Sequence, residues 1–140
     1  MDVIIEQTYT ADEFETLPFD GNHYELVDGR IIEKMSPGDE HGWISRNIFR
    51  ELTLFDPHEK LGSMWPSTSF KLSENTTPIP DLAFVVKARI PNPRSKKAVQ
   101  VVPDFVVEVW SPGDLQSKGA TEAAIIKISL PYTKLKEANK

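Results

Sequence analysis

Three acidic residues of this 140-residue chain lie in stretches that are otherwise apolar. Glu108 lies within DFVVEVW, Asp81 begins DLAFVV, and Glu25 lies within YELV. A continuous apolar run is typical of a strand that is covered on both faces, where an ionised carboxylate is costly unless a positive group meets it. For Glu108 that group could be a lysine or arginine in a structural ion pair, or a metal ion, and this run alone leaves both open.

Asp81 favours the metal interpretation because it follows Pro80 and begins a second apolar strand. Carboxylates on two strands of one sheet can converge on one point, and oxygen ligands suit Mg²⁺ or Mn²⁺. Such an ion can activate water and stabilise a phosphodiester transition state. Asp104 also follows a proline, but it begins the strand of Glu108 and lies about 13 Å from it along an extended chain. We therefore expect Asp81, and not Asp104, to share an ion with Glu108.

The first half of the chain contains clear signals for the elements that must position these acids. Thr10 and Glu13 have the spacing of a capping box, which predicts a short helix. Asp28-Gly29 separates two short β-prone runs, which predicts a hairpin. Apolar residues at spacings of four, four and three then predict a longer helix, which Pro57 ends: Ile44, Ile48, Leu52 and Phe55.

The second half of the chain reads as several strands followed by a helix. Extended segments are expected over residues 61–72, 82–86 and 99–110. A second long helix is expected after Ser111, with apolar residues at helical spacing: Leu115, Ala123, Ile126 and Leu130. This order predicts a single α/β (α+β) domain over residues 1–140, with a central mixed β-sheet flanked by helices.

Charge and composition narrow the class of protein. The net charge is −5 and the chain has no cysteine, which excludes a disulfide framework and a thiolate zinc site and suits a reducing cytoplasm. No apolar run approaches the ~18 residues of a membrane span. Residues 82–103 lack acids and carry five bases, which could contact phosphate or form a solvated surface loop: Lys87, Arg89, Arg94, Lys96 and Lys97.

The segments YELVDGRII, PIPDLAFVV and PDFVVEVWSPGD, followed by Lys127, resemble the Uma-two family of putative restriction endonucleases over about residues 8–130. That family belongs to the PD-(D/E)XK nuclease superfamily. The resemblance implies a mixed sheet with a metal site at one end, where Pro80-Asp81 is the PD pair, Glu108 the second acid and Glu25 an additional acid. It therefore implies an endonuclease that hydrolyses DNA with Mg²⁺ or Mn²⁺ held by these three carboxylates.

One position departs from the superfamily pattern. The lysine expected two residues after the second acid is replaced by Trp110. The resemblance suggests that Lys127, on the following helix, supplies this ammonium; a surface lysine near a helix C-terminus is the alternative. His41 follows SPGD, where related proteins often have a histidine, and it is either a phosphate or proton-transfer contact or a solvated residue of the first helical turn.

Further expectations follow from the resemblance. The five bases and His41 are candidate DNA contacts, and a homodimer is expected because cutting both strands asks for two sites. Residues 130–140 read as a divergent or truncated tail, so C-terminal strands of the family fold could be missing. That tail and the acidic net charge favour an alternative of another class, a catalytically inactive remnant of the fold that acts as a binding or interaction module.

Overall fold

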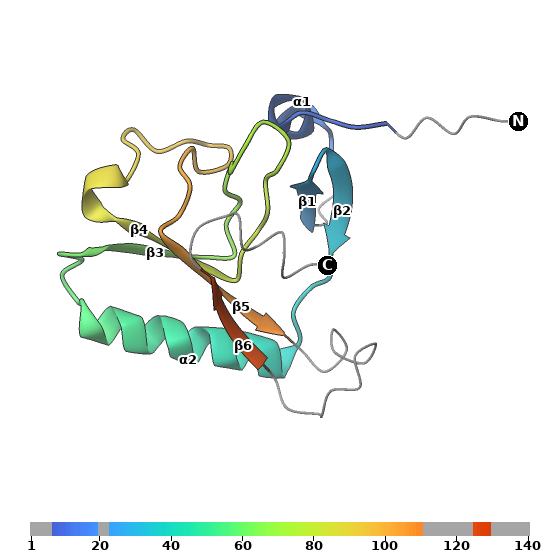
Figure 1. Ribbon diagram of the computed structural model, residues 1–140. Coiled ribbons are helices and arrows are strands. Elements are labelled where there is room, and N and C mark those ends of the chain that lie inside the picture. The colour runs from blue at the N-terminus through green and yellow to red at the C-terminus, as the bar shows by residue number, and fades with distance from the viewer. Residues whose placement is uncertain (1–6, 20–22, 111–124, 130–140) are drawn as a thin grey trace, which may run out of the picture.

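The computed structural model describes residues 7–19 and 23–110 and the backbone of residues 125–129 (Figure 1). The elements are α1 (Ala11–Thr16), β1 (His23–Val27), β2 (Arg30–Lys34), α2 (Asp39–Phe55), β3 (Gly62–Pro66), β4 (Leu82–Val86), the 3₁₀ turn η1 (Lys87–Arg89), β5 (Phe105–Trp110) and β6 (Ile125–Ser129). Strands β1 and β2 form a hairpin, and the other four form one sheet in the order β3-β4-β5-β6. Neither described α-helix is long and apolar enough to cross a membrane.

The local signals in the first half of the chain are confirmed. The Thr10 side chain accepts the Glu13 N–H and the Glu13 side chain accepts the Thr10 N–H, both at 3.1 Å, so the capping box starts α1. Asp28 and Gly29 have φ angles of 50° and 82°, which is the left-handed conformation that a two-residue hairpin turn requires at both positions. This turn sets the register of the hairpin and pairs Glu25 with Ile32.

The four-stranded sheet separates the two sides of the domain. Helix α2 lies against one face, through β3 and β5, whereas α1 and the β1–β2 hairpin lie on the other side, beyond the long connections (Figure 1). Phe70 from one connection packs on Ala83, Val85 and Val106 of the sheet to form the core on that side. The α/β class is confirmed, although every described strand pair is antiparallel where we expected mixed directions. Apolar runs show where strands lie but do not fix their relative direction.

The predicted helix after Ser111 is wrong where the structure describes the chain. Ile125–Ser129 is strand β6, and it pairs antiparallel with β5 from Trp110↔Ile125 to Val106↔Ser129. Three of the five residues in IIKIS are isoleucine, and β-branched side chains favour a pleated strand with a partner over a helix. The other residues used for the helical spacing, Leu115, Ala123 and Leu130, and the tail over 130–140 lie outside the described residues.

Candidate active site

Two of the predicted acids meet at one end of the sheet. Leu82 of β4 pairs with Val107 of β5, so Asp81 and Glu108 occupy the next pair of positions on the same two strands. Their carboxyl groups are joined by a side-chain hydrogen bond. Asp81 is only 6% exposed, and its Oδ2 accepts the backbone N–H of Val109 at 2.7 Å. The sheet therefore holds two carboxyl groups in contact at a largely buried position.

Burial and neighbouring charge change the acidity of Glu108. Burial is the largest cause, and together with the adjacent Asp81 and Glu25 it raises the pKa of Glu108 from 4.5 to about 8, although Lys34 opposes this shift. Two carboxyl groups in one low-dielectric site cannot both ionise cheaply, so the pair retains a proton near neutral pH. A divalent cation at the same place would favour the doubly ionised form.

Two nitrogen-bearing side chains contact the buried acid. Lys34 Nζ lies 3.6 Å from Asp81 Oδ1 and also donates a hydrogen bond to the carbonyl oxygen of Ile79. His41 Nε2 lies 3.2 Å from Asp81 Oδ2, and the His41 side chain is 15% exposed. The interpretation of His41 as a solvated first-turn residue is therefore wrong, because the N-terminal turn of α2 brings it onto Asp81.

Glu25 is attached to the site through the backbone of Ile79. Its Oε2 accepts the Ile79 N–H at 2.8 Å, while Lys34 from the neighbouring strand binds the Ile79 carbonyl oxygen. In the hairpin Glu25 pairs with Ile32, two residues before Lys34, so Glu25 and Lys34 lie diagonally on one face. The hairpin therefore delivers one negative and one positive group to the connection that leads into Asp81.

The residues present fit a metal ion with two protein ligands better than one with three. Mg²⁺ is commonly held by one or two carboxylates and otherwise by water and substrate oxygens, which the pair of Asp81 and Glu108 suits. Within the residues that the structure describes, no three His, Cys, Asp or Glu side chains are grouped so that they could hold an ion. Glu25, expected as a third ligand, uses one of its oxygens on the Ile79 backbone.

The two lysines associated with the pair differ in part from expectation. In the register of β5 and β6, Lys127 is the direct backbone partner of Glu108. Lys127 thus lies across a strand pair and not on a helix. Lys34 was not among the predicted site residues, yet the two-residue turn at Asp28-Gly29 contains the signal, since it fixes a register that places Lys34 on the face of Glu25.

The basic segment is divided among different roles. Arg89 binds Asp104 at 2.7 Å and donates to the Val102 carbonyl oxygen at 2.8 Å, so it braces the entry to β5. Arg94 lies over the ring of Trp65, 5.4 Å from its centroid. The remaining three bases of the segment are exposed, one within η1 and two beside a cavity: Lys87, Lys96 and Lys97.

Comparisons with known proteins identify a matching family and a similar fold. A family model described as "Uma2: Putative restriction endonuclease" matches residues 11–127. The fold is similar to the crystal structure of a putative nuclease belonging to DUF820 from Anabaena variabilis, with a TM-score of 0.64 and 23% sequence identity over 79% of this chain. The match spans 63% of the length of that protein. No curated protein matches the chain.

Proposed function

The chain belongs to the Uma2 family of putative restriction endonucleases, and we propose that it is a metal-dependent endonuclease that hydrolyses DNA phosphodiester bonds. The observation that carries the proposal is the contact between Asp81 and Glu108, in which the pKa of Glu108 is raised to about 8. A pair of carboxyl groups that retains a proton in a buried site is suited to exchange that proton for Mg²⁺ or Mn²⁺. The family and the fold support a nuclease.

In this proposal Asp81 and Glu108 hold the ion, and Glu25 adds a third negative charge next to them. The bound ion would supply an activated water and stabilise the charge that develops on the phosphate. Lys34 holds Asp81 in place through its 3.6 Å contact. Lys127, the cross-strand partner of Glu108, orients the attacking water as an ammonium or takes its proton as the neutral amine.

The other groups around the pair have supporting roles. His41 contacts Asp81 Oδ2 at 3.2 Å, and its Nδ1 is buried with no hydrogen-bond partner in the described part of the chain. A phosphate oxygen or a water that enters the site would supply that partner. Exposed bases of the basic segment contact the DNA backbone, whereas Arg89 is committed to Asp104. We further propose a homodimer, because cutting both strands of a duplex requires two active sites. A cytoplasmic location is proposed as well, since a chain without cysteine suits a reducing compartment.

A metal titration combined with a cleavage assay tests the proposal. Asp81→Asn keeps the shape of the side chain and an acceptor for Val109, whereas Asp12→Asn changes a side chain that is 85% exposed and lies on α1. Calorimetry should show Mn²⁺ binding to wild type and to Asp12→Asn but not to Asp81→Asn, and plasmid cleavage should follow the same order. A wild-type chain that neither binds Mn²⁺ nor cuts DNA would leave the inactive binding module as the better description.

A further inference from the structure

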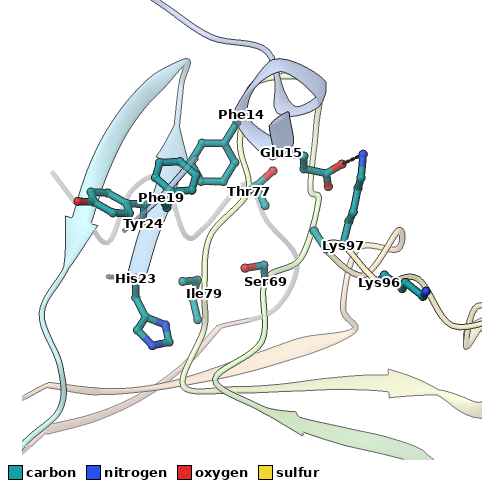
Figure 2. A pocket seen from close by; sticks show the side chains of 11 residues that line it. Phe14, Glu15, Phe19, His23, Tyr24, Ser69, Thr77, Ile79, Lys96 and Lys97 are labelled. Atoms are coloured by element: carbon teal, nitrogen blue, oxygen red, sulfur yellow. Dashed lines mark ion pairs between the residues drawn. The ribbon is translucent and has the colours of Figure 1, made fainter. Parts of the chain in front are cut away.

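A cavity of about 330 Å³ lies between α1, β1 and residues 96–98 (Figure 2). Ligand-binding cavities in proteins begin near this size, at about 300 Å³. Three aromatic rings line one side of it: the centroids of Phe14 and Phe19 are 5.1 Å apart, and those of Phe19 and Tyr24 are 4.6 Å apart with the rings stacked. A row of aromatic rings at the wall of a cavity suits a planar aromatic ligand.

Two buried oxygens on the same cavity have no partner. Glu15 Oε1 and Thr77 Oγ1 both belong to lining residues, and neither has a hydrogen-bond partner among the described residues. Thr77 is 1% exposed, and the Glu15 side chain is 12% exposed. Lys97 Nζ lies 3.9 Å from the other carboxylate oxygen of Glu15, which is beyond hydrogen-bond distance. Buried polar atoms are nearly always paired, so a ligand with N–H donors would complete the hydrogen bonding of these two oxygens.

The opposite edge of the cavity is positively charged. Lys96 and Lys97 line it there, both are exposed, and the Lys97 side chain is 60% exposed (Figure 2). A purely apolar ligand would leave the Glu15 and Thr77 oxygens unpaired, and a simple anion would meet the Glu15 carboxylate. A ligand with an aromatic ring, an amino group and a phosphate matches all three parts of the lining. That combination is a nucleotide whose base carries an exocyclic amino group.

The cavity is joined to the candidate active site through Ile79. The side chain of Ile79 lines the cavity, while its N–H binds Glu25 and its carbonyl oxygen binds Lys34. We propose that the cavity accepts one amino-bearing base of the bound DNA strand and so sets a base preference beside the point of cleavage. This step rests on the proposed nuclease function for its substrate, but the binding chemistry of the cavity is measurable without cleavage.

Binding of single nucleotides without metal is the first experiment. Cytosine carries an N4 amino group where thymine has a carbonyl oxygen, and thymine also has a C5 methyl group. We therefore expect wild type to bind deoxycytidine monophosphate at least about fivefold more tightly than deoxythymidine monophosphate in EDTA. Glu15→Leu should abolish this difference, and Thr77→Val, a change of similar shape, should reduce it. Glu51→Leu, which alters a glutamate that is 68% exposed on α2, is the matched control and should retain it. Equal binding of both nucleotides by wild type would overturn the proposal.

Oligonucleotides distinguish a base in DNA from a free nucleotide. A thymine oligonucleotide with a single cytosine should bind wild type more tightly than one without it, and Glu15→Leu should bind both equally. Discrimination between free nucleotides but not between these oligonucleotides would overturn the proposed reading of DNA. If the protein cuts DNA with no base preference that Glu15→Leu changes, the inference fails while the nuclease stands. If cytosine is preferred but nothing is cut, the nuclease proposal fails while the cavity assignment stands.

Discussion

Glu108→Gln should remove a pH dependence from the stability of the metal-free protein. The pKa of Glu108 is raised from 4.5 to about 8, so the folded chain holds this proton more tightly than the unfolded chain does. The folded state is therefore favoured at acid pH, and the free energy of unfolding falls as the pH rises from about 4.5 towards 8. Glutamine keeps the size and hydrogen-bonding ability of the side chain but has no proton to lose.

The pKa shift of Glu108 determines how much the free energy of unfolding changes with pH. One pKa unit corresponds to about 1.4 kcal/mol, so at pH 7 the raised pKa of Glu108 lowers the free energy of unfolding by about 3 kcal/mol relative to strongly acid conditions. Most of that loss falls between pH 5 and pH 7. A domain with a net stability of about 5–15 kcal/mol would register such a change clearly.

Urea unfolding at a series of pH values between 5 and 8, in EDTA, measures this dependence. The curve of wild type should fall with pH, that of Glu108→Gln should be flatter, and that of Glu51→Gln, an exposed control, should follow wild type. Saturating Mn²⁺ should restore much of the stability of wild type at pH 7 and leave Glu108→Gln almost unchanged, because binding to the folded chain alone stabilises it. Parallel curves for wild type and Glu108→Gln would refute the assigned coupling between Glu108 and its neighbours.

Three further substitutions test the surroundings of the pair. Lys34→Met should raise the pKa of Glu108 further and lower stability by about 2 kcal/mol, because a charge near Asp81 is lost; pH-dependent urea unfolding measures both. Lys127→Met should abolish plasmid cleavage while circular dichroism shows an intact fold, and Lys127→Arg should rescue little; a Met variant that cuts like wild type would exclude Lys127. Thr10→Ala should cost about 1 kcal/mol in thermal unfolding without changing cleavage, since it removes only the cap of α1.

The elements that depend on residues adjacent in the chain were predictable from the sequence. Those that depend on pairing with a distant segment of the same chain were not. The capping box at Thr10 and the turn at Asp28-Gly29 require only residues that are adjacent in the chain, and both form as expected. The segment Ile125–Ser129 has an apolar spacing that a helix also allows, and only the ladder with β5 makes it a strand. Direction and pairing of strands are likewise set by contacts between distant segments.

The candidate site shows the same division. Asp81 and Glu108 could be selected from the sequence because acids inside apolar runs are conspicuous, and the structure brings the two together. His41 of α2 and Lys34 of the hairpin contact Asp81, although they precede it by 40 and 47 residues in the sequence. Nothing in the spacing of either residue indicates that contact. For Lys34 the hairpin register shows that it shares a face of the hairpin with Glu25, but not which part of the chain packs against that face.

The connection over residues 77–81 packs against the hairpin face that carries Glu25 and Lys34. Pro78 and Pro80 have no N–H, so Ile79 carries the one backbone donor between them, and Glu25 accepts it. Thr77 exchanges two backbone hydrogen bonds with Leu26 of the same hairpin strand, at 2.7 and 3.0 Å. The hairpin is therefore bonded at Thr77 and Ile79 to the connection that leads into Asp81, and the position of Asp81 against Glu108 depends on these bonds. A change that loosens this connection should thus disturb metal binding at Asp81 and the shape of the cavity beside Ile79 together.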